Sequence, residues 1–273
     1  MVGLGLVGGS VCRALRVAFP GLVLSGVDKP AIVELAQGSG VIDGGVAADD
    51  DAAVAGLLAR ADAVVRALPV LAVAATVGRH ASILRETLVM DTGSTKRAVV
   101  DAARAAGLRA FVGGHPMAGK SSGGLAHADA RLFDGARWFL CADGDVDGAV
   151  IARARELVRA TGAVPVEVDA ADHDRDVALT SHVPHLMANV LAEAVLSAGA
   201  TDAAGGSLKD MLKVAGAPFD VWGDTISTNR VAIRDALDDL VTRLRSVQDS
   251  LDDKDRLREL FAHGRALRER VHG

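Results

Sequence analysis

The sequence contains no tyrosine, few other aromatic residues and only two cysteines. Aromatic side chains make up 3% of the 273 residues, whereas half of the residues are hydrophobic, so aliphatic side chains must fill any core. Cys12 and Cys141 are far apart in the sequence and match neither a metal-binding spacing nor a disulfide framework. We therefore expect neither a bound metal nor a structural disulfide.

Long apolar runs and blocks of basic charge are also absent. No run of about 18 uninterrupted apolar residues occurs, so we expect no membrane span, and the first residues do not resemble a signal peptide. The formal net charge is -5 at pH 7 and acids and bases are interspersed, which disfavours a nucleic-acid partner. We expect a cytoplasmic protein that binds small molecules.

A glycine-rich segment opens the chain and matches the pattern G-x-G-x-x-G. In this pattern Gly3 makes the turn out of a strand, and Gly5 lets a pyrophosphate approach the backbone. Gly8 allows close packing of helix and strand, and the N-terminus of the following helix, at Leu6 and Val7, faces the anion. The segment predicts a dinucleotide site, although the pattern alone is common among unrelated proteins.

An acidic residue follows at the spacing that such a site requires. The segment 22–27 predicts a strand, and Asp28 comes directly after it, twenty residues beyond Gly8. A carboxylate at this point can accept hydrogen bonds from both ribose hydroxyls and repels a 2′-phosphate. The spacing predicts NAD rather than NADP as the cofactor. The alternative is that Asp28 is a turn residue before Pro30.

The first strand has very few residues in this sequence. Only Met1 and Val2 precede Gly3, whereas a strand usually has about five residues. We therefore expect the natural chain to begin several residues upstream of Met1. N-terminal sequencing of the native protein checks this expectation, and a chain that starts at Met1 would contradict it.

Short apolar segments alternate with helical segments through the first 169 residues. The segments that predict strands are 63–69, 88–90, 110–112, 138–141 and 164–168, with a helix at about 150–160. This alternation is typical of an α/β fold with a Rossmann-type, doubly wound parallel sheet. Ligands bind beyond the carboxyl ends of the strands in such sheets. One cleft should therefore contain the residues just past the predicted strand ends, which are Asp28, Pro69, Ser94 and His115.

Helical patterns dominate the chain after Asp169. The segments 170–199, 228–250 and 252–272 predict helices, and apolar residues recur at helical spacing from Ile233 to Val247. We therefore expect a nucleotide-binding domain at 1–169 and an all-helical domain at 170–273. So small a helical layer buries its apolar faces best against a second copy of itself, which predicts a homodimer.

One histidine follows an apolar run and two glycines. Gly113 and Gly114 allow close approach of a ligand, and Pro116 interrupts a regular continuation. The pattern predicts that a strand ends at the glycines and presents His115 to a ligand. The alternative is a tight turn with a surface histidine.

Several motifs occur together and in order along nearly the whole chain. They are Gly3 to Ser10, Asp91-Thr92-Gly93-Ser94-Thr95-Lys96, Gly114-His115-Pro116-Met117-Ala118-Gly119, His173-Asp174, Ser181-His182-Val183-Pro184-His185, and the segment from Gly205 to Trp222. This set resembles the prephenate dehydrogenase family, the NAD(P)-linked enzymes of tyrosine biosynthesis and their arogenate and 4-amino-4-deoxyprephenate relatives. The resemblance implies a nucleotide domain followed by a helical domain that dimerises.

The resemblance also implies a role for each matching residue. His115 matches the histidine that takes the proton of the substrate 4-hydroxyl, and Ser94 matches the serine that holds this hydroxyl near the nicotinamide. Lys213 aligns with the arginine that binds a substrate carboxylate. Positions on the substrate side of the cleft are matched by His173, Ser181 and His185. The alternatives are that Ser94 bonds to its own loop and that Lys213 is a solvated lysine.

Two positions depart from the family pattern. Ser121 stands where the family often has a glutamate, and Lys213 keeps the charge of the arginine but not its two-pronged geometry. The resemblance implies NAD-dependent oxidative decarboxylation of prephenate to 4-hydroxyphenylpyruvate. Because of these departures, a 4-amino-4-deoxyprephenate or arogenate dehydrogenase is the alternative. A catalytically silent NAD-binding regulator is a third hypothesis.

Overall fold

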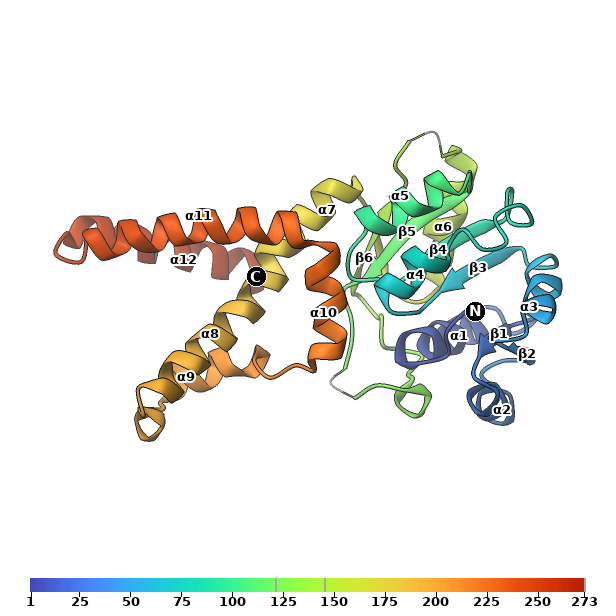
Figure 1. The fold of residues 1–273 in the computed structure, drawn as a ribbon, viewed down its shortest axis with the longest axis horizontal. Coiled ribbons are helices and arrows are strands. Elements are labelled where there is room, and N and C mark those ends of the chain that lie inside the picture. Colours follow the sequence, from blue (N-terminus) through green and yellow to red (C-terminus); the bar gives the residue numbers. More distant parts are fainter. Residues whose placement is uncertain (121, 145, 273) are drawn as a thin grey trace.

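The computed structural model describes residues 1–120, 122–144 and 146–272, so the departure at Ser121 lies outside the described residues. The chain forms an N-terminal α/β domain and a C-terminal helical domain that extends away from it (Figure 1). The last strand of the first domain ends at Glu167, and the first helix of the second begins at Ala170. The expected fold class, a Rossmann-type domain followed by a helical domain, is confirmed.

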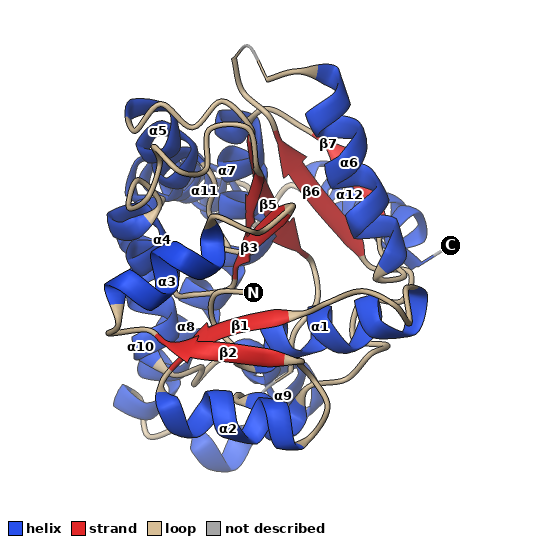
Figure 2. Cartoon of the chain, turned by 90° about the vertical axis from the view of Figure 1, so that its right-hand side faces the viewer, coloured by secondary structure: helices blue, strands red, loops and turns tan. Residues whose placement is uncertain are grey.

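The strands of the first domain belong to one sheet. They are β1 (Ser25–Asp28), β2 (Gly44–Ala47), β3 (Ala63–Arg66), β4 (Leu88–Asp91), β5 (Phe111–Pro116), β6 (Arg137–Cys141) and β7 (Val164–Glu167). Val2 forms parallel bridges to Val27 of β1 and to Arg66 of β3, and so joins two groups of strands. The order across the sheet is therefore β2, β1, Val2, β3, β4, β5, β6, β7, and Figure 2 shows the paired β1 and β2.

The direction of the strands changes near one edge of the sheet. The pairs from β2 to β5 are parallel, but β6 is antiparallel to β5, and β7 is parallel to β6. A parallel pair needs a crossover connection, usually a helix. In its described part, the chain between β5 and β6 contains only the short 3₁₀ turn η1 (Leu125–His127). The chain therefore returns along β5 in the opposite direction.

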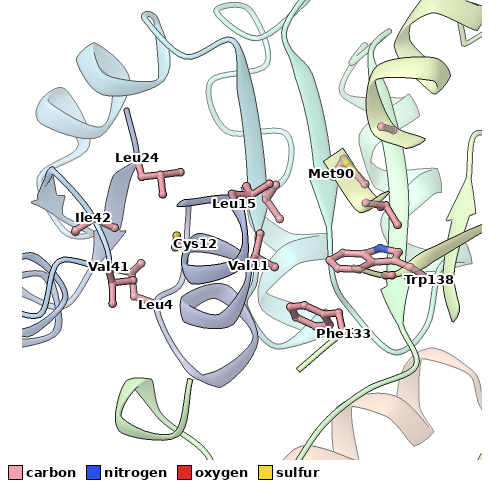
Figure 3. Packing of buried hydrophobic residues seen from close by; sticks show 14 of the residues in the cluster. Leu4, Val11, Cys12, Leu15, Leu24, Val41, Ile42, Met90, Phe133 and Trp138 are labelled. Atoms are coloured by element: carbon pink, nitrogen blue, oxygen red, sulfur yellow. The ribbon is translucent and has the colours of Figure 1, made fainter. Parts of the chain in front are cut away.

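Helices cover both faces of the sheet. α1 (Leu6–Ala18), α2 (Pro30–Gly38) and α6 (Gly148–Ala160) pack on one face, and α3 (Asp51–Leu58), α4 (Val70–Thr76) and α5 (Arg97–Ala105) on the other. Successive strand residues point to opposite faces, so Val65 belongs to the first core and Val64 to the second. Figure 3 shows Val11 and Leu15 of α1 in the first core, with Trp138 beside them.

Three details of the strands differ from the sequence prediction. β1 begins at Ser25 rather than at Leu22. The short β2 was not predicted, because its half-buried Gly-Gly-Val-Ala sequence carries little strand preference. β5 does not end at the glycines, because its residues from Gly113 to Pro116 pair with β6. His115 therefore lies within a strand, opposite Phe139, and past the last paired residues of β4.

The helical domain begins with one continuous helical segment. It consists of α7 (Ala170–Val177), the π-helical turn η2 (Ala178–His182) and α8 (Val183–Ser197). The elements that follow are η3 (Thr201–Ala203), α9 (Gly206–Met211), η4 (Leu212–Val214), α10 (Phe219–Thr228), α11 (Arg230–Asp249) and α12 (Lys254–His272). α10 packs against α4, whereas α8 and α11 point away from the first domain in different directions (Figure 1). None of the described helices is long and apolar enough to cross a membrane.

Candidate active site

The glycines at the start of the chain form a tight junction between Val2 and α1. Gly3 has a φ of +90°, and a Cβ there would lie 2.4 Å from the carbonyl oxygen of Ala67. A Cβ on Gly8 would lie 2.0 Å from the carbonyl oxygen of Gly3, so neither position admits a side chain. A Cβ on Gly5 would meet no atom within 4 Å, which leaves open space in front of α1.

The N-terminus of α1 has the properties of an anion site. Gly5 is its N-cap and provides no side-chain cap, and the first turn, which starts at Leu6 and Val7, contains no acidic residue. Unpaired N–H groups and the helix dipole favour a phosphate at such a terminus. These residues therefore fit the pyrophosphate of a dinucleotide.

Asp28 ends β1 next to this helix terminus. Its Oδ2 accepts a hydrogen bond from the N–H of Leu4 at 2.6 Å, and its Oδ1 accepts one from the N–H of Lys29 at 2.7 Å. These bonds orient the carboxylate and leave further lone pairs for ribose hydroxyls. Pro69, the N-cap of α4, lies just beyond β3 at the same carboxyl edge of the sheet.

A buried ion pair holds the loop that carries Ser94. Lys96 Nζ donates hydrogen bonds to Asp91 Oδ2 and to the carbonyl oxygen of Gly114, and the side chains of Lys96 and Asp91 are fully buried. Asp91 also accepts hydrogen bonds from the N–H groups of Gly93 at 2.8 Å and Gly114 at 3.0 Å. The pair therefore joins the loop after β4 to the residue that precedes His115.

Ser94 is half-buried, and its hydroxyl makes no hydrogen bond to any residue that the structure describes. The neighbouring Thr95 contacts the helical domain instead, with its Oγ1 2.8 Å from Oγ1 of Thr228. The alternative in which Ser94 bonds to its own loop is therefore not observed, and its hydroxyl is available to a ligand.

A chain of hydrogen bonds connects His115 to the helical domain. His115 Nδ1 lies 2.9 Å from Nε2 of His173, and His173 Nδ1 lies 2.8 Å from Oδ1 of Asp174. The ring of Phe139 packs edge-on against His173. His173 is 1% exposed and both of its ring nitrogens are engaged. No ring nitrogen of His173 is therefore left for a hydrogen bond to a substrate, and its place on the substrate side of the cleft stays a prediction.

The surroundings favour a neutral His115 near pH 7. Desolvation, followed by the proximity of His173 and Lys96, lowers the pKa of His115 well below its usual value of 6.5. A neutral imidazole can accept a proton, whereas an imidazolium cannot. The lowered pKa of His115 thus favours the protonation state that a general base requires.

Asp174 contacts the α/β domain as well as His173. Its Oδ1 accepts a hydrogen bond from the N–H of Lys96 at 2.7 Å, and its Oδ2 accepts one from the N–H of Arg97 at 3.0 Å. These N–H groups lie at the start of α5, which has no side-chain cap from its own N-cap residue. One carboxylate of the helical domain therefore caps α5 and holds His173 beside His115.

The π-helical turn η2 carries Ser181 and His182. In a regular α-helix the carbonyl of Thr180 would need the N–H of Pro184, which proline lacks, and the helix widens at this point. Asn229 Nδ2 donates to the carbonyl oxygen of Asp174 at 2.7 Å and lies 3.2 Å from His182 Nδ1. Burial lowers the pKa of His182 to about 4, although Asp174 acts in the opposite direction.

His185 lies one turn beyond Ser181. Its Nδ1 donates to the carbonyl oxygen of Ser181 at 2.9 Å, and its Nε2 has no partner among the described residues. Its ring lies against Trp222 with the centroids 4.0 Å apart, and Trp222 meets His182 edge-on at 5.8 Å. The junction of the two domains therefore brings together His115, His173, His182 and His185.

Lys213 is not part of this group in the single chain. Its side chain is 74% exposed, and its Nζ forms an ion pair with Asp210 at 2.8 Å. A cavity of about 1400 Å³ opens between the α/β domain, α7 and α11, and His173 is among its lining residues. Of the predicted site residues in the described part of the chain, His115, Ser94, Ser181, His185 and Lys213 do not line this cavity. The structure thus leaves the substrate contact expected for Lys213 without support.

Three residues of the junction were not singled out by the sequence. Asp174 was part of a motif, but its two roles depend on contacts with α5 and His173. Asn229 and Trp222 are distant in sequence from the histidines that they contact. Trp222 ends one of the matched motifs, the segment from Gly205 to Trp222, and it is one of two tryptophans in a chain with few aromatic residues. Its contacts with the histidines, and those of Asn229, depend on the fold.

Family models match most of the chain. Residues 11–167 match the nucleotide-binding domain of prephenate dehydrogenase, and residues 169–263 match the prephenate dehydrogenase dimerization domain. The chain belongs to the prephenate dehydrogenase family. This membership confirms the resemblance drawn from the motifs, and the first match begins after Gly8, so it does not depend on the glycine pattern.

Individual members of the prephenate dehydrogenase family show the same relationship. Prephenate dehydrogenase of Bacillus subtilis is 30% identical over 268 residues, which cover 93% of this chain and 70% of that protein. Cyclohexadienyl dehydrogenase of Zymomonas mobilis is 27% identical, with 98% and 94% covered. The crystal structure of Aquifex aeolicus prephenate dehydrogenase with hydroxyphenyl propionate and NAD+ has the same fold, with a TM-score of 0.86 at 24% identity and 99% and 96% covered. The chain is thus an oxidoreductase of this family.

Proposed function

We propose that this protein is an NAD-dependent prephenate dehydrogenase that forms 4-hydroxyphenylpyruvate for tyrosine biosynthesis. The observation that carries the proposal is the position of His115, which contacts His173 at the carboxyl edge of the sheet. The same edge carries Gly3, Gly5 and Gly8, which we call the glycine cradle. The cytoplasmic location expected from the sequence remains a prediction.

The proposed reaction requires a base at the substrate hydroxyl. Prephenate is a cyclohexadienol with a ring carboxylate and a pyruvyl side chain. Oxidation removes a hydride from C4 while the 4-hydroxyl loses its proton, and departure of the ring carboxylate as CO2 then leaves an aromatic phenolate. His115 accepts the hydroxyl proton at Nε2, because its Nδ1 is engaged by His173. The imidazolium that forms can return this proton to the phenolate.

Three further residues complete the proposed site. The hydroxyl of Ser94, unbonded among the described residues, helps to hold the substrate hydroxyl next to His115. Ser181 and the unpartnered Nε2 of His185 face the polar groups of the substrate in this proposal.

NAD is the cofactor that the glycine cradle and Asp28 fit. When bound, it supplies the hydride acceptor. The chain binds its pyrophosphate at the start of α1, with Gly5 leaving room, and orients its ribose with Asp28. The NAD+ found with the Aquifex aeolicus relative supports this assignment.

A carboxylate contact of Lys213 is a separate part of the proposal. If Lys213 binds the pyruvyl carboxylate, Lys213→Met should raise KM for the substrate about tenfold or more and leave kcat nearly unchanged. Lys209→Met is the matched control, because Lys209 is an exposed lysine of the same segment. Equal KM values in the two variants would identify Lys213 as a solvated lysine.

The pairing of Lys213 with Asp210 favours a second candidate substrate. An alanyl side chain, as in arogenate, carries an ammonium and a carboxylate, and this pair presents one charge of each sign. The test is turnover of prephenate, arogenate and 4-amino-4-deoxyprephenate by the wild type and by His115→Asn. Turnover of an amino compound without turnover of prephenate would reverse the order of the candidates. NAD binding with no turnover of any of the three would indicate a regulator.

We also propose that residues 170–273 form a homodimer. The helical domain exposes large apolar side chains, including Phe219 and Phe261, each 76% exposed, and Leu196 at 68%. These side chains are available to a partner, and the match to a dimerization domain supports a second copy as that partner. Sedimentation at micromolar concentration should give a dimer, and a monomer would contradict the proposal.

A further inference from the structure

We propose that Asp174 is a positioning residue that acts through His173 to place the proton of His115 on Nδ1, which leaves the lone pair of Nε2 free for the substrate. This inference rests on the proposed role of His115 as the base. It adds that the helical domain prepares the base, because both His173 and Asp174 belong to α7.

The donors and acceptors between Asp174 and His115 determine which ring nitrogen of each histidine carries the proton. An ionised carboxylate only accepts hydrogen bonds, so His173 Nδ1 must donate to Asp174 Oδ1 across the 2.8 Å contact. The Nε2 of a neutral His173 is then an acceptor. His115 Nδ1 must therefore donate to it across 2.9 Å, which places the lone pair of His115 on Nε2.

The remaining contacts of Asp174 keep it in the acceptor role. Its Oδ1 also accepts the N–H of Lys96, and its Oδ2 accepts the N–H of Arg97. A backbone N–H group can only donate. A proton on Oδ1 or Oδ2 of Asp174 would therefore face the N–H of Lys96 or of Arg97, so both oxygens must accept. The cap on α5 thus sets the direction of every hydrogen bond between Asp174 and His115.

The same contacts link the base to the docking of the domains. Lys96 and Arg97 belong to the start of α5 in the α/β domain, and Asp174 belongs to the helical domain. Loss of this docking would remove His173 from His115 and leave the proton of His115 free to occupy either nitrogen. Base preparation and domain docking therefore depend on one carboxylate.

Nitrogen NMR of the full-length protein tests the proton positions without substrate. In protein labelled with 15N-histidine at about pH 7.5, His115 should show a protonated Nδ1 and an unprotonated Nε2, with the signals assigned by their loss in His115→Asn. Asp174→Ala removes the acceptor that orients His173, so a signal from a protonated Nε2 of His115 should appear. A wild-type His115 protonated on Nε2 would overturn the inference.

Kinetics of a double-mutant cycle tests the path through His173. Asp174→Ala should lower kcat by about 10²–10⁴-fold, the range for a positioned acid–base group, with a smaller change in KM. In a His173→Phe background the same substitution should leave kcat unchanged. It should still lower the thermal stability in that background, because the cap on α5 is lost in either case. A fall in kcat by the same factor in both backgrounds would show that Asp174 has only a structural role.

A conservative variant provides a further check if His173→Phe does not fold. The side chain of His173→Gln offers an oxygen to His115 Nδ1 and an amide N–H to Asp174, so it should keep the proton on Nδ1 and retain part of kcat. A His173→Gln enzyme in which Nε2 of His115 becomes protonated would contradict the inference. If His115 carries its proton on Nε2 and His115→Asn is inactive, the inference fails but the proposed function stands. If His115 carries its proton on Nδ1 and His115→Asn is active, the proposed function is rejected instead.

Discussion

Replacing Gly114 by alanine should disturb both the fold and the position of His115. The added Cβ would lie 2.4 Å from the carbonyl oxygen of Asp91 and 2.8 Å from Nε1 of Trp138. Asp91 and Trp138 are fully buried, so neither can move without disturbing its neighbours. Overpacking of this kind destabilises by typically 1–3 kcal/mol. Two contacts below 3 Å place Gly114→Ala at the upper end, about 3 kcal/mol.

The loss of stability and the loss of activity have separate measurements. In a chain of this size 1 kcal/mol lowers Tm by about 2–4 °C, so Gly114→Ala should lower it by about 6–12 °C in a calorimetric scan. β5 must also shift relative to β4 and displace His115, and a misplacement of about 1 Å reduces the rate by about 100-fold. Single-turnover kinetics with saturating substrate measures this second effect.

A matched glycine provides the control for this substitution. Gly148 is the first residue of α6, and a Cβ there would meet no atom within 4 Å. Gly148→Ala should therefore change the free energy of unfolding by less than about 0.5 kcal/mol. Equal Tm values for Gly114→Ala and Gly148→Ala would refute the reasoning, since the two variants add the same methyl group.

Three further predictions concern protonation and the cofactor. His115→Asn should lower kcat by about 10²–10⁴-fold with little change in NAD affinity. The acid limb of kcat/KM in the wild type should lie well below pH 6.5, because the pKa of His115 is lowered in the folded protein and activity is lost only as His115 protonates. An acid limb at pH 6.5 or above would contradict this. The pKa of His182 falls to about 4 on folding, so the unfolded chain binds the proton first as the pH falls. The free energy of unfolding should therefore decrease between pH 6.5 and 4, by on the order of 3 kcal/mol. A His182→Gln variant with the same pH dependence in denaturant titrations would argue against this origin. Asp28→Asn should raise kcat/KM with NADP relative to NAD by about tenfold or more, since a like charge is removed from the 2′-phosphate; an unchanged ratio would reject the role of Asp28.

The glycine cradle and the position of His115 were accessible from the sequence because their requirements are local. Gly3 and Gly8 have no room for a Cβ, and both lie in one short segment with the helix that they introduce. His115 was identified from its glycines and proline, although it lies in a strand rather than after one. The pairing of Gly113 to Pro116 with β6 depends on a distant segment, and no local pattern encodes it.

The hydrogen-bonded chain from His115 through His173 to Asp174 could not be predicted from spacing in the sequence. His115 and His173 are separated by 58 positions, and Asp174 reaches Lys96 across 78. A histidine next to an aspartate indicates polar chemistry but not which atom each ring nitrogen contacts. The family resemblance placed His173 on the substrate side of the cleft, and the structure adds its contacts with His115 and Asp174.

The buried pair of Asp91 and Lys96 restricts how this site can vary. Removing either side chain leaves an uncompensated charge in the interior, which destabilises by about 3–5 kcal/mol. Replacing both with apolar residues leaves the N–H groups of Gly93 and Gly114 and the carbonyl of Gly114 without hydrogen-bond partners. Each unsatisfied group destabilises the fold by about 1–3 kcal/mol. Neither a single nor a double exchange offers a low-energy route away from this arrangement. Both side chains are fully buried. In a library of random variants selected only for folding, both positions should therefore remain unchanged.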